Sequence, residues 1–99
     1  MQDPRIKEVA KILVEYSNEI KKGDKVAIDA SIEAIPLVKE LYKLCLQKGA
    51  YPKTNLVIPV ITKIYYDNIS QEQLKHFPDL KMYEAKYTDA FFTIGAPSN

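Results

Sequence analysis

The chain has 99 residues, of which 46% are hydrophobic and 27% are charged, and these near-average fractions exclude a disordered chain. No apolar run approaches the roughly 20 residues that span a bilayer, so a membrane is not an expected partner. The 14 basic and 13 acidic residues are interspersed, which argues against nucleic acid as a partner. The polar start lacks the apolar centre of a secretory signal and favours a cytoplasmic location. We therefore expect one domain over residues 1–99.

The first predicted element is a helix that begins at Asp3 and Pro4. Aspartate can accept from the orphan N–H groups of a first turn, and proline fits the first helical position. Lys21, Lys22 and Gly23 are predicted to end this helix, because cations and a left-handed glycine suit a helix C-terminus. Apolar residues at helical spacing predict its buried face: Ile6, Val9, Ala10, Leu13, Tyr16 and Ile20.

Two buried strands and a second helix are predicted next. Residues 25–29 form a short strand with an apolar centre, and residues 51–58 form another that ends at Pro59. Ser31 is expected to cap the helix between them, with Glu33 in its first turn, and Gly49 to close it. The buried stripe of this helix is predicted to contain Ala34, Val38, Leu41, Tyr42, Cys45 and Leu46.

The last third of the chain predicts short helices and a final strand. Residues 62–68 are expected to be helical, and "SQEQ" places Ser70 and Gln73 at capping-box spacing. A further turn or helix carries Leu80, Met82, Tyr83 and Tyr87. Residues 91–94 then read as a strand that is apolar on both faces.

This alternation of helices and strands predicts the fold class. We expect a three-layer α/β domain with a short parallel sheet, strand order 2-1-3, right-handed crossovers and helices on both faces. The third strand then lies at an edge, although every residue of "AFFTI" except Thr93 is apolar. Because exposed apolar edge strands are an aggregation hazard, we predict a sheet that is incomplete at this edge. Either more polypeptide or a partner chain is expected to cover it.

Few residues are candidates for chemistry. The three glycines stand at element ends and form neither a dinucleotide fingerprint nor a phosphate loop. One histidine, His76, and one cysteine, Cys45, are too few for a closed zinc site. We expect His76 to be a helix-end residue. Cys45 is expected to be a core residue, and the alternative for Cys45 is a reactive thiol. No catalytic, cofactor-binding or metal-ligating residue is therefore assigned.

Asp29 and Ser31 stand where the first strand meets its helix, and Pro97 and Asn99 lie in the turn after the last strand. Open α/β sheets bind ligands at these carboxyl ends of parallel strands. The four residues are predicted to line a ligand-side or interdomain turn. Turn and cap chemistry is the alternative explanation for Asp29 and Ser31.

Four stretches resemble the thermophilic metalloprotease family of aminopeptidases, which includes aminopeptidases T, S and II. "DPRIKEVAKILVEYSNEIKKGDKVAI" is similar to the family's opening helix and first strand, and "EAIPLVKELYKLCLQKGAYP" to its next helix. "SQEQL" and "APSN" resemble two further family segments. The matched positions are Asp3, Pro4, Arg5, Leu13, Val14, Tyr16, Ser17, Gly23, Asp24, Val26, Glu33, Ala34, Pro36, Leu37, Val38, Gly49, Ala50, Pro52, the segment 70–74 and the turn 96–99.

The resemblance implies an N-terminal domain of a larger enzyme. In that family two divalent metal ions are held by glutamate, histidine, tyrosine and aspartate side chains of a C-terminal domain, so no ligand is carried over to residues 1–99. The implied function is a non-catalytic domain of a metal-dependent aminopeptidase, with the C-terminal catalytic domain or a second copy as partner and no activity of its own. The alternatives are an interaction module that pairs through its open sheet edge, and a small-molecule binding domain that uses Asp29, Ser31 and the 95–99 turn.

Overall fold

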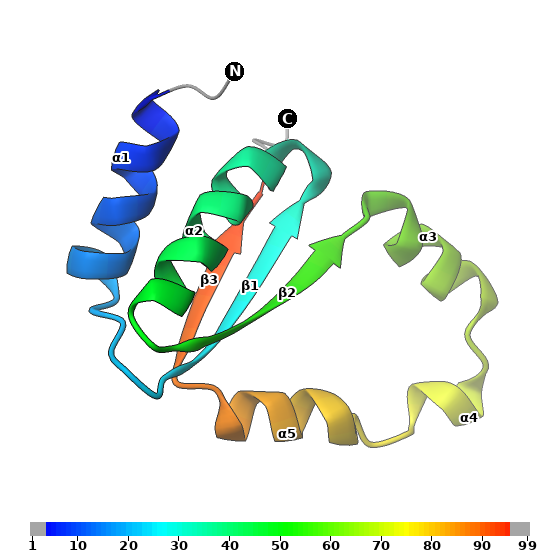
Figure 1. Cartoon of the computed structure of the whole chain (residues 1–99). Helices are drawn as coiled ribbons and strands as arrows, with labels where there is room; N and C mark the ends of the chain where they lie inside the picture. Colours follow the sequence, from blue (N-terminus) through cyan, green and yellow to red (C-terminus); the bar gives the residue numbers. More distant parts are fainter. Residues whose placement is uncertain (1–3, 96–99) are drawn as a thin grey trace. The chain divides into compact units, whose positions relative to one another are not determined.

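The computed structural model describes residues 4–95 (Figure 1). They form two compact units, one with the segments up to Val57 and from Thr88 onward, the other Ile58–Tyr87. The prediction of one domain over residues 1–99 stays a prediction. The first unit contains helix α1 (Pro4–Ile12), the π-turn η1 (Leu13–Ser17), strand β1 (Lys25–Ser31), the 3₁₀ turn η2 (Ile32–Ala34), helix α2 (Ile35–Gln47), and strands β2 (Tyr51–Val57) and β3 (Ala90–Ile94). The second contains helices α3 (Pro59–Asn68), α4 (Gln71–Leu74) and α5 (Asp79–Tyr87).

The sheet has three parallel strands in the order β2-β1-β3, so the predicted α/β class and strand order are confirmed. Val26 of β1 pairs with Pro52 of β2 and with Ala90 of β3. The architecture fits the three-layer α/β class. The sheet is open, because within residues 4–95 the strands β2 and β3 each pair with β1 alone.

The core of the first unit lies between the sheet and two helices. Helices α1 and α2 lie side by side over one face of the sheet (Figure 1). Since successive side chains of a strand point to opposite faces, Val26 and Ile28 of β1 point into this core, whereas Ala27 and Asp29 point to the other face. The buried cluster consists of Ala10, Val14, Ile20, Val26, Ile28, Leu41, Cys45, Ala50 and Phe92.

The end of the first helix differs from the prediction. Its helical residues end at Ser17 and do not reach Lys21. The N–H of Asn18 donates to the carbonyl of Leu13 at 3.2 Å, which is the wider spacing of a π-turn. The predicted buried face is wrong at Val9 and Tyr16, which are 44% and 72% exposed, whereas Ala10 and Val14 are buried.

The bounds of β1, β2 and α3 also differ from the predicted ones, because each strand is followed directly by a helical segment. Strand β1 continues to Ser31, and β2 ends at Val57 because Ile58 is already the N-cap of α3. Pro59 follows β2 as predicted, but it also lies in the first turn of α3, so this helix begins before residue 62. The predicted cap at Asp3 lies outside the described residues.

Helix α2 is confirmed between Ser31 and Gly49, with part of its predicted buried stripe. Leu41 and Cys45 are fully buried, whereas Tyr42 and Leu46 are exposed because they lie toward the solvent side of the same helix. Gly49 follows the C-cap with a φ of +83°, the left-handed conformation that favours glycine there.

The second unit has no buried residue between Ile58 and Tyr87. The capping box of α4 is confirmed: Ser70 Oγ accepts from the N–H of Gln73, and Gln73 Oε1 accepts from the N–H of Ser70, both at 3.1 Å. Apolar side chains such as Leu80 remain exposed on its helices. None of the helices within residues 4–95 combines the length and apolar character that a membrane span requires.

Candidate functional site

A row of three polar side chains crosses the sheet on the face opposite α1 and α2. Asp29 of the central strand β1 pairs in register with Asn55 of β2 and with Thr93 of β3. Ile28 points into the core, so Asp29 and its two partners point away from it. The sheet thereby brings a carboxylate, an amide and a hydroxyl into one line.

The best-defined contact in this row joins Asp29 to Asn55. Asn55 Nδ2 donates to Asp29 Oδ1 at 2.8 Å in a partly buried position. A hydrogen bond to an ionised acceptor is stronger than one between neutral groups. This contact therefore fastens edge strand β2 to β1 at a fixed register.

Ser31 lies on the same face as Asp29, where β1 ends and η2 begins. It holds the N-cap position of the 3₁₀ turn η2 with extended backbone angles, and its side chain makes no capping hydrogen bond. The prediction that Ser31 caps the second helix is therefore wrong, because the N-cap of α2 is Ala34. Pro97 and Asn99 lie outside the described residues. The interpretation of Asp29, Ser31, Pro97 and Asn99 as a ligand-side or interdomain turn thus stays a prediction.

Asn55 was not among the residues predicted for this site. The signal was present in the sequence, because two parallel strands that begin at residues 25 and 51 place residue 29 beside residue 55. The residues at each strand end do not by themselves show this contact, because it depends on how the two strands align.

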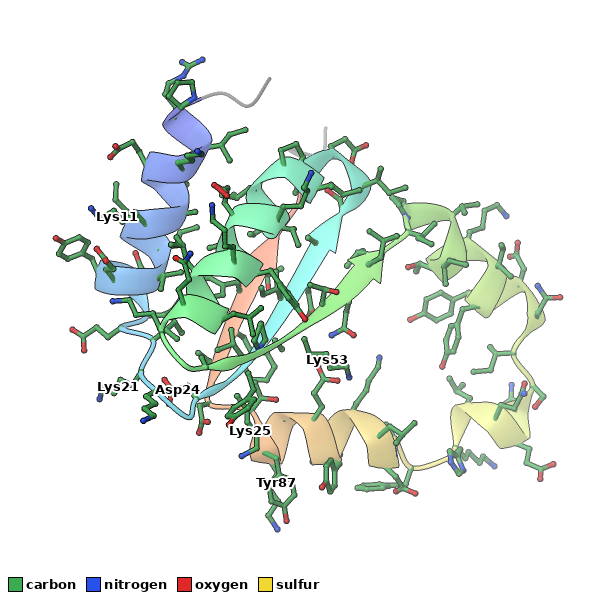
Figure 2. All side chains as sticks on the ribbon, viewed as in Figure 1. Lys11, Lys21, Asp24, Lys25, Lys53 and Tyr87 are labelled. Carbon is green, nitrogen blue, oxygen red and sulfur yellow. The ribbon has the colours of Figure 1, made fainter. Side chains whose placement is uncertain are left out.

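Two acidic side chains, Asp24 and Asp89, accept hydrogen bonds from main-chain groups at the opposite end of the sheet. Figure 2 shows Asp24 between Lys21 and Lys25. Asp24 Oδ2 accepts from the N–H of Lys21 at 2.8 Å. Asp89 Oδ2 accepts from the N–H of Lys25 at 2.8 Å, and the N–H of Asp89 donates back to the Lys25 carbonyl at 2.8 Å. These carboxylates therefore fix the loops that lead into β1 and β3.

Two ionisable side chains of α2 are buried. Cys45 is fully buried, and burial raises the pKa of its thiol, so the core interpretation of this cysteine is confirmed. Glu40 is only 6% exposed, and its Oε2 atom lies 3.3 Å from Lys43 Nζ. A buried glutamate was not predicted; the nearby lysine supplies the opposite charge that such a group needs.

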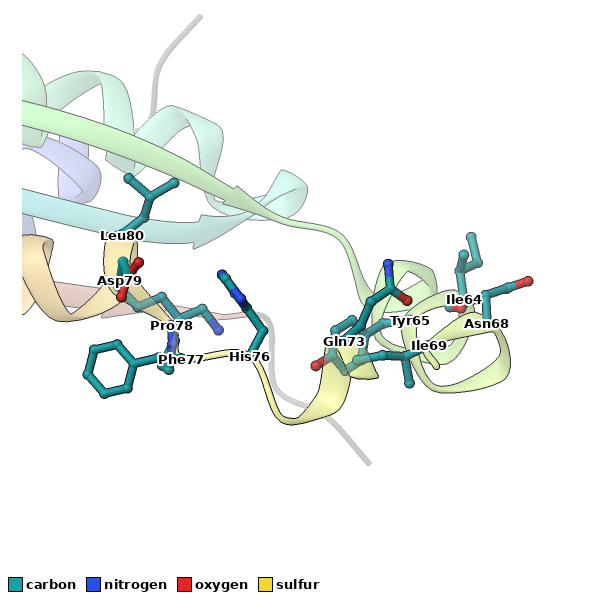
Figure 3. A pocket seen from close by; sticks show the side chains of 11 residues that line it. Ile64, Tyr65, Asn68, Ile69, Gln73, His76, Phe77, Pro78, Asp79 and Leu80 are labelled. Atoms are coloured by element: carbon teal, nitrogen blue, oxygen red, sulfur yellow. Dashed lines mark hydrogen bonds between the residues drawn. The ribbon is translucent and has the colours of Figure 1, made fainter. Parts of the chain in front are cut away.

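An open groove of about 960 Å³ lies within the second unit (Figure 3). His76 is exposed, and it follows the C-cap residue of α4, which agrees with the prediction of a helix-end residue. The other lining residues are Ile64, Tyr65, Asn68, Ile69, Gln73, Phe77, Pro78, Asp79, Leu80 and Lys81. The groove is mainly apolar, with one imidazole, one carboxylate and one ammonium group at its wall.

The side chains that could ligate a metal lie scattered over the described part of the chain. Within residues 4–95, no three side chains of the types His, Cys, Asp and Glu lie close enough together to hold a metal ion. A catalytic zinc uses three protein ligands of these types. Residues 4–95 therefore do not fit a catalytic metal by themselves.

Comparison with known protein families shows to which family the chain belongs. A family model described as thermophilic metalloprotease matches residues 2–99. The chain belongs to this family. The match spans all four stretches that carried the resemblance in sequence, so that resemblance is confirmed. No curated protein matches the chain. Residues 2–99 thus correspond to at least part of a thermophilic metalloprotease.

Proposed function

We propose that this chain is the N-terminal, non-catalytic domain of a cytoplasmic metal-dependent aminopeptidase, an enzyme that removes N-terminal residues from peptides. The observation that carries the proposal is the match of residues 2–99 to the thermophilic metalloprotease family. In this proposal two divalent metal ions are bound by a C-terminal domain, and the residues described above scaffold that domain.

The contacts of the potential ligands support a scaffolding role. The carboxylates of Asp24 and Asp89 accept from main-chain N–H groups, and Asp29 accepts from Asn55. His76, the one histidine of the sequence, is exposed on the connection between α4 and α5. The three carboxylates thus each have a structural partner.

The test compares two proteins: the 99-residue chain and the protein made from the complete reading frame of its source. Bound metal is measured by elemental analysis, and activity by the release of N-terminal leucine from a chromogenic peptide. We expect metal and activity in the longer protein only. Activity in the 99-residue chain would contradict the non-catalytic assignment, and inactivity of both proteins would contradict the aminopeptidase.

Two variants of the longer protein sharpen this test. His76→Gln and Asp29→Asn each remove a potential metal ligand and keep a polar side chain of similar size. We expect both variants to retain the metal content and the activity of the unchanged protein. Loss of metal from either variant, with the fold intact by circular dichroism, would place a ligand in this domain.

The open sheet favours a second candidate function, an interaction module that self-associates or binds a partner through its edge. This candidate requires that the isolated chain form oligomers or capture a strand. Sedimentation equilibrium over a wide concentration range tests it. A well-folded monomer at every concentration would exclude self-association.

A further inference from the structure

The second unit, Ile58–Tyr87, lacks the features that hold the first unit together. None of its residues is buried, and within this segment α3, α4 and α5 do not pack closely on one another. These helices have 10, 4 and 9 residues, all below the roughly 12–15 residues under which an isolated helix is only marginally stable in water. Burial of apolar surface therefore offsets little of the conformational entropy that this unit loses on folding.

The ion pair, the capping box and the aromatic pairs of this unit all join residues that are close in the chain. Lys63 Nζ lies 2.7 Å from Asp67 Oδ2, one helical turn away, and both side chains are mainly exposed. The capping box joins Ser70 to Gln73, and the two aromatic ring pairs join residues that are adjacent or one turn apart. Exposed ion pairs contribute little to stability. These contacts hold single turns of helix and do not tie the three helices to one another.

Both ends of this unit continue into the sheet of the first unit. Strand β2 pairs with β1 along its seven residues, and Asn55 donates to Asp29. At the other end, Asp89 makes two hydrogen bonds of 2.8 Å with Lys25, and Phe92 of β3 is buried in the core. Strand β3 is therefore held by the first unit and not by the segment that leads to it.

We propose that Ile58–Tyr87 is a strap that unfolds and refolds as a separate cooperative unit while the first unit stays folded with β3 in place. Proteins open in such units where few apolar contacts are buried. The sheet tethers the strap at both ends, so opening exposes its backbone without releasing either strand. This conformational device goes beyond the proposed function and does not depend on it, because the contacts that carry it lie within residues 25–94.

Two tyrosines of the 99-residue chain provide a matched test by chymotrypsin cleavage, followed by mass spectrometry. Tyr66 of the strap and Tyr51 of β2 are 68% and 67% exposed, so exposure alone predicts equal cleavage. Because a protease cuts locally unfolded backbone, we expect cleavage after Tyr66 to be at least about 10-fold faster than after Tyr51. Equal rates, or faster cleavage after Tyr51, would overturn the proposal.

A core substitution shows whether the strap opens on its own. Leu41→Ala weakens the first unit, so it would speed cleavage after Tyr66 by about 100-fold if that cleavage required unfolding of the whole chain. We expect the rate after Tyr66 to change by less than about 3-fold. An increase of about 10-fold or more would overturn the independence of the strap.

Amide hydrogen exchange of the unchanged chain decides the same question if Leu41→Ala does not fold. We expect the amides of α3 and α5 to exchange at least about 100-fold faster than those of Leu41 and Cys45 in α2. Their exchange should also rise less steeply with urea, because opening of the strap exposes less surface than unfolding of the whole chain. Equal protection and equal urea dependence in both units would overturn the proposal.

The cleaved chain tests whether β3 stays in place. After cleavage within the strap, the N-terminal and C-terminal fragments are expected to elute together on gel filtration in buffer and to separate in urea. The reason is that β3 pairs with β1 and buries Phe92 in the core. Separation of the fragments without urea would contradict the anchoring of β3.

Discussion

Replacing Leu41 by alanine is expected to lower the free energy of unfolding of the first unit by about 3.5 kcal/mol. Leu41 lies in α2, is fully buried, and belongs to the cluster between the helices and the sheet. Few single side chains of this small core fill so much of its interior. Its removal therefore tests whether α2 is packed on the sheet as described.

The magnitude has two parts. The substitution deletes three carbon groups, and their transfer from water contributes about 0.8 kcal/mol each. The space left behind adds about 24 cal/mol per Å³, so a residual void of roughly 50 Å³ adds about 1.2 kcal/mol. The expected loss in free energy of unfolding is well above the usual effect of a surface substitution. It is also a large fraction of the stability of a domain of this size.

The assay is urea unfolding, monitored by circular dichroism, with Leu46→Ala as the control. Leu46 lies on the same helix and is 53% exposed, so its truncation leaves no enclosed cavity and is expected to cost about 1 kcal/mol or less. The midpoint should change and the slope should stay constant. Equal destabilisation by the two substitutions would refute the packing of Leu41 described above.

Three further predictions concern single residues. Burial raises the pKa of the Cys45 thiol, so the unfolded chain ionises first as the pH rises. The free energy of unfolding should therefore fall as the pH rises through the pKa of the unfolded thiol, and Cys45→Ala should lack this part of the fall in paired urea titrations. Gly49→Ala should lower the free energy of unfolding by about 1–2 kcal/mol, because φ is +83° and a Cβ atom would lie 3.0 Å from a Lys22 side-chain carbon. Gly23→Ala, where φ is +88° and the space is open, should lower it less in the same titration. The reverse order would be inconsistent with this geometry. Ser70→Ala should speed amide exchange at the N-terminus of α4 by about 5-fold, whereas Ser70→Thr, which keeps the hydroxyl, should not.

Part of the candidate site could be predicted from sequence. Asp29 and Ser31 were found because polar residues directly after an apolar strand indicate a strand end in an α/β sheet. Asn55 was missed, since its contact with Asp29 depends on the register between two strands that are far apart in the chain. Buried Glu40 was missed for a related reason: helical periodicity does not show that Lys43 is placed to pair with it.

The sequence by itself determined the order of helices and strands and the capping box, because local signals govern these features. It also determined the strand order 2-1-3, because that order follows from the connectivity of the strands. Periodicity, turn residues and the handedness of crossovers act over short segments or follow from connectivity. Only the tertiary structure decided the π-turn after Ile12 and the exposure of Tyr16, since the packing of α1 against α2 selects which turn of the helix faces the core.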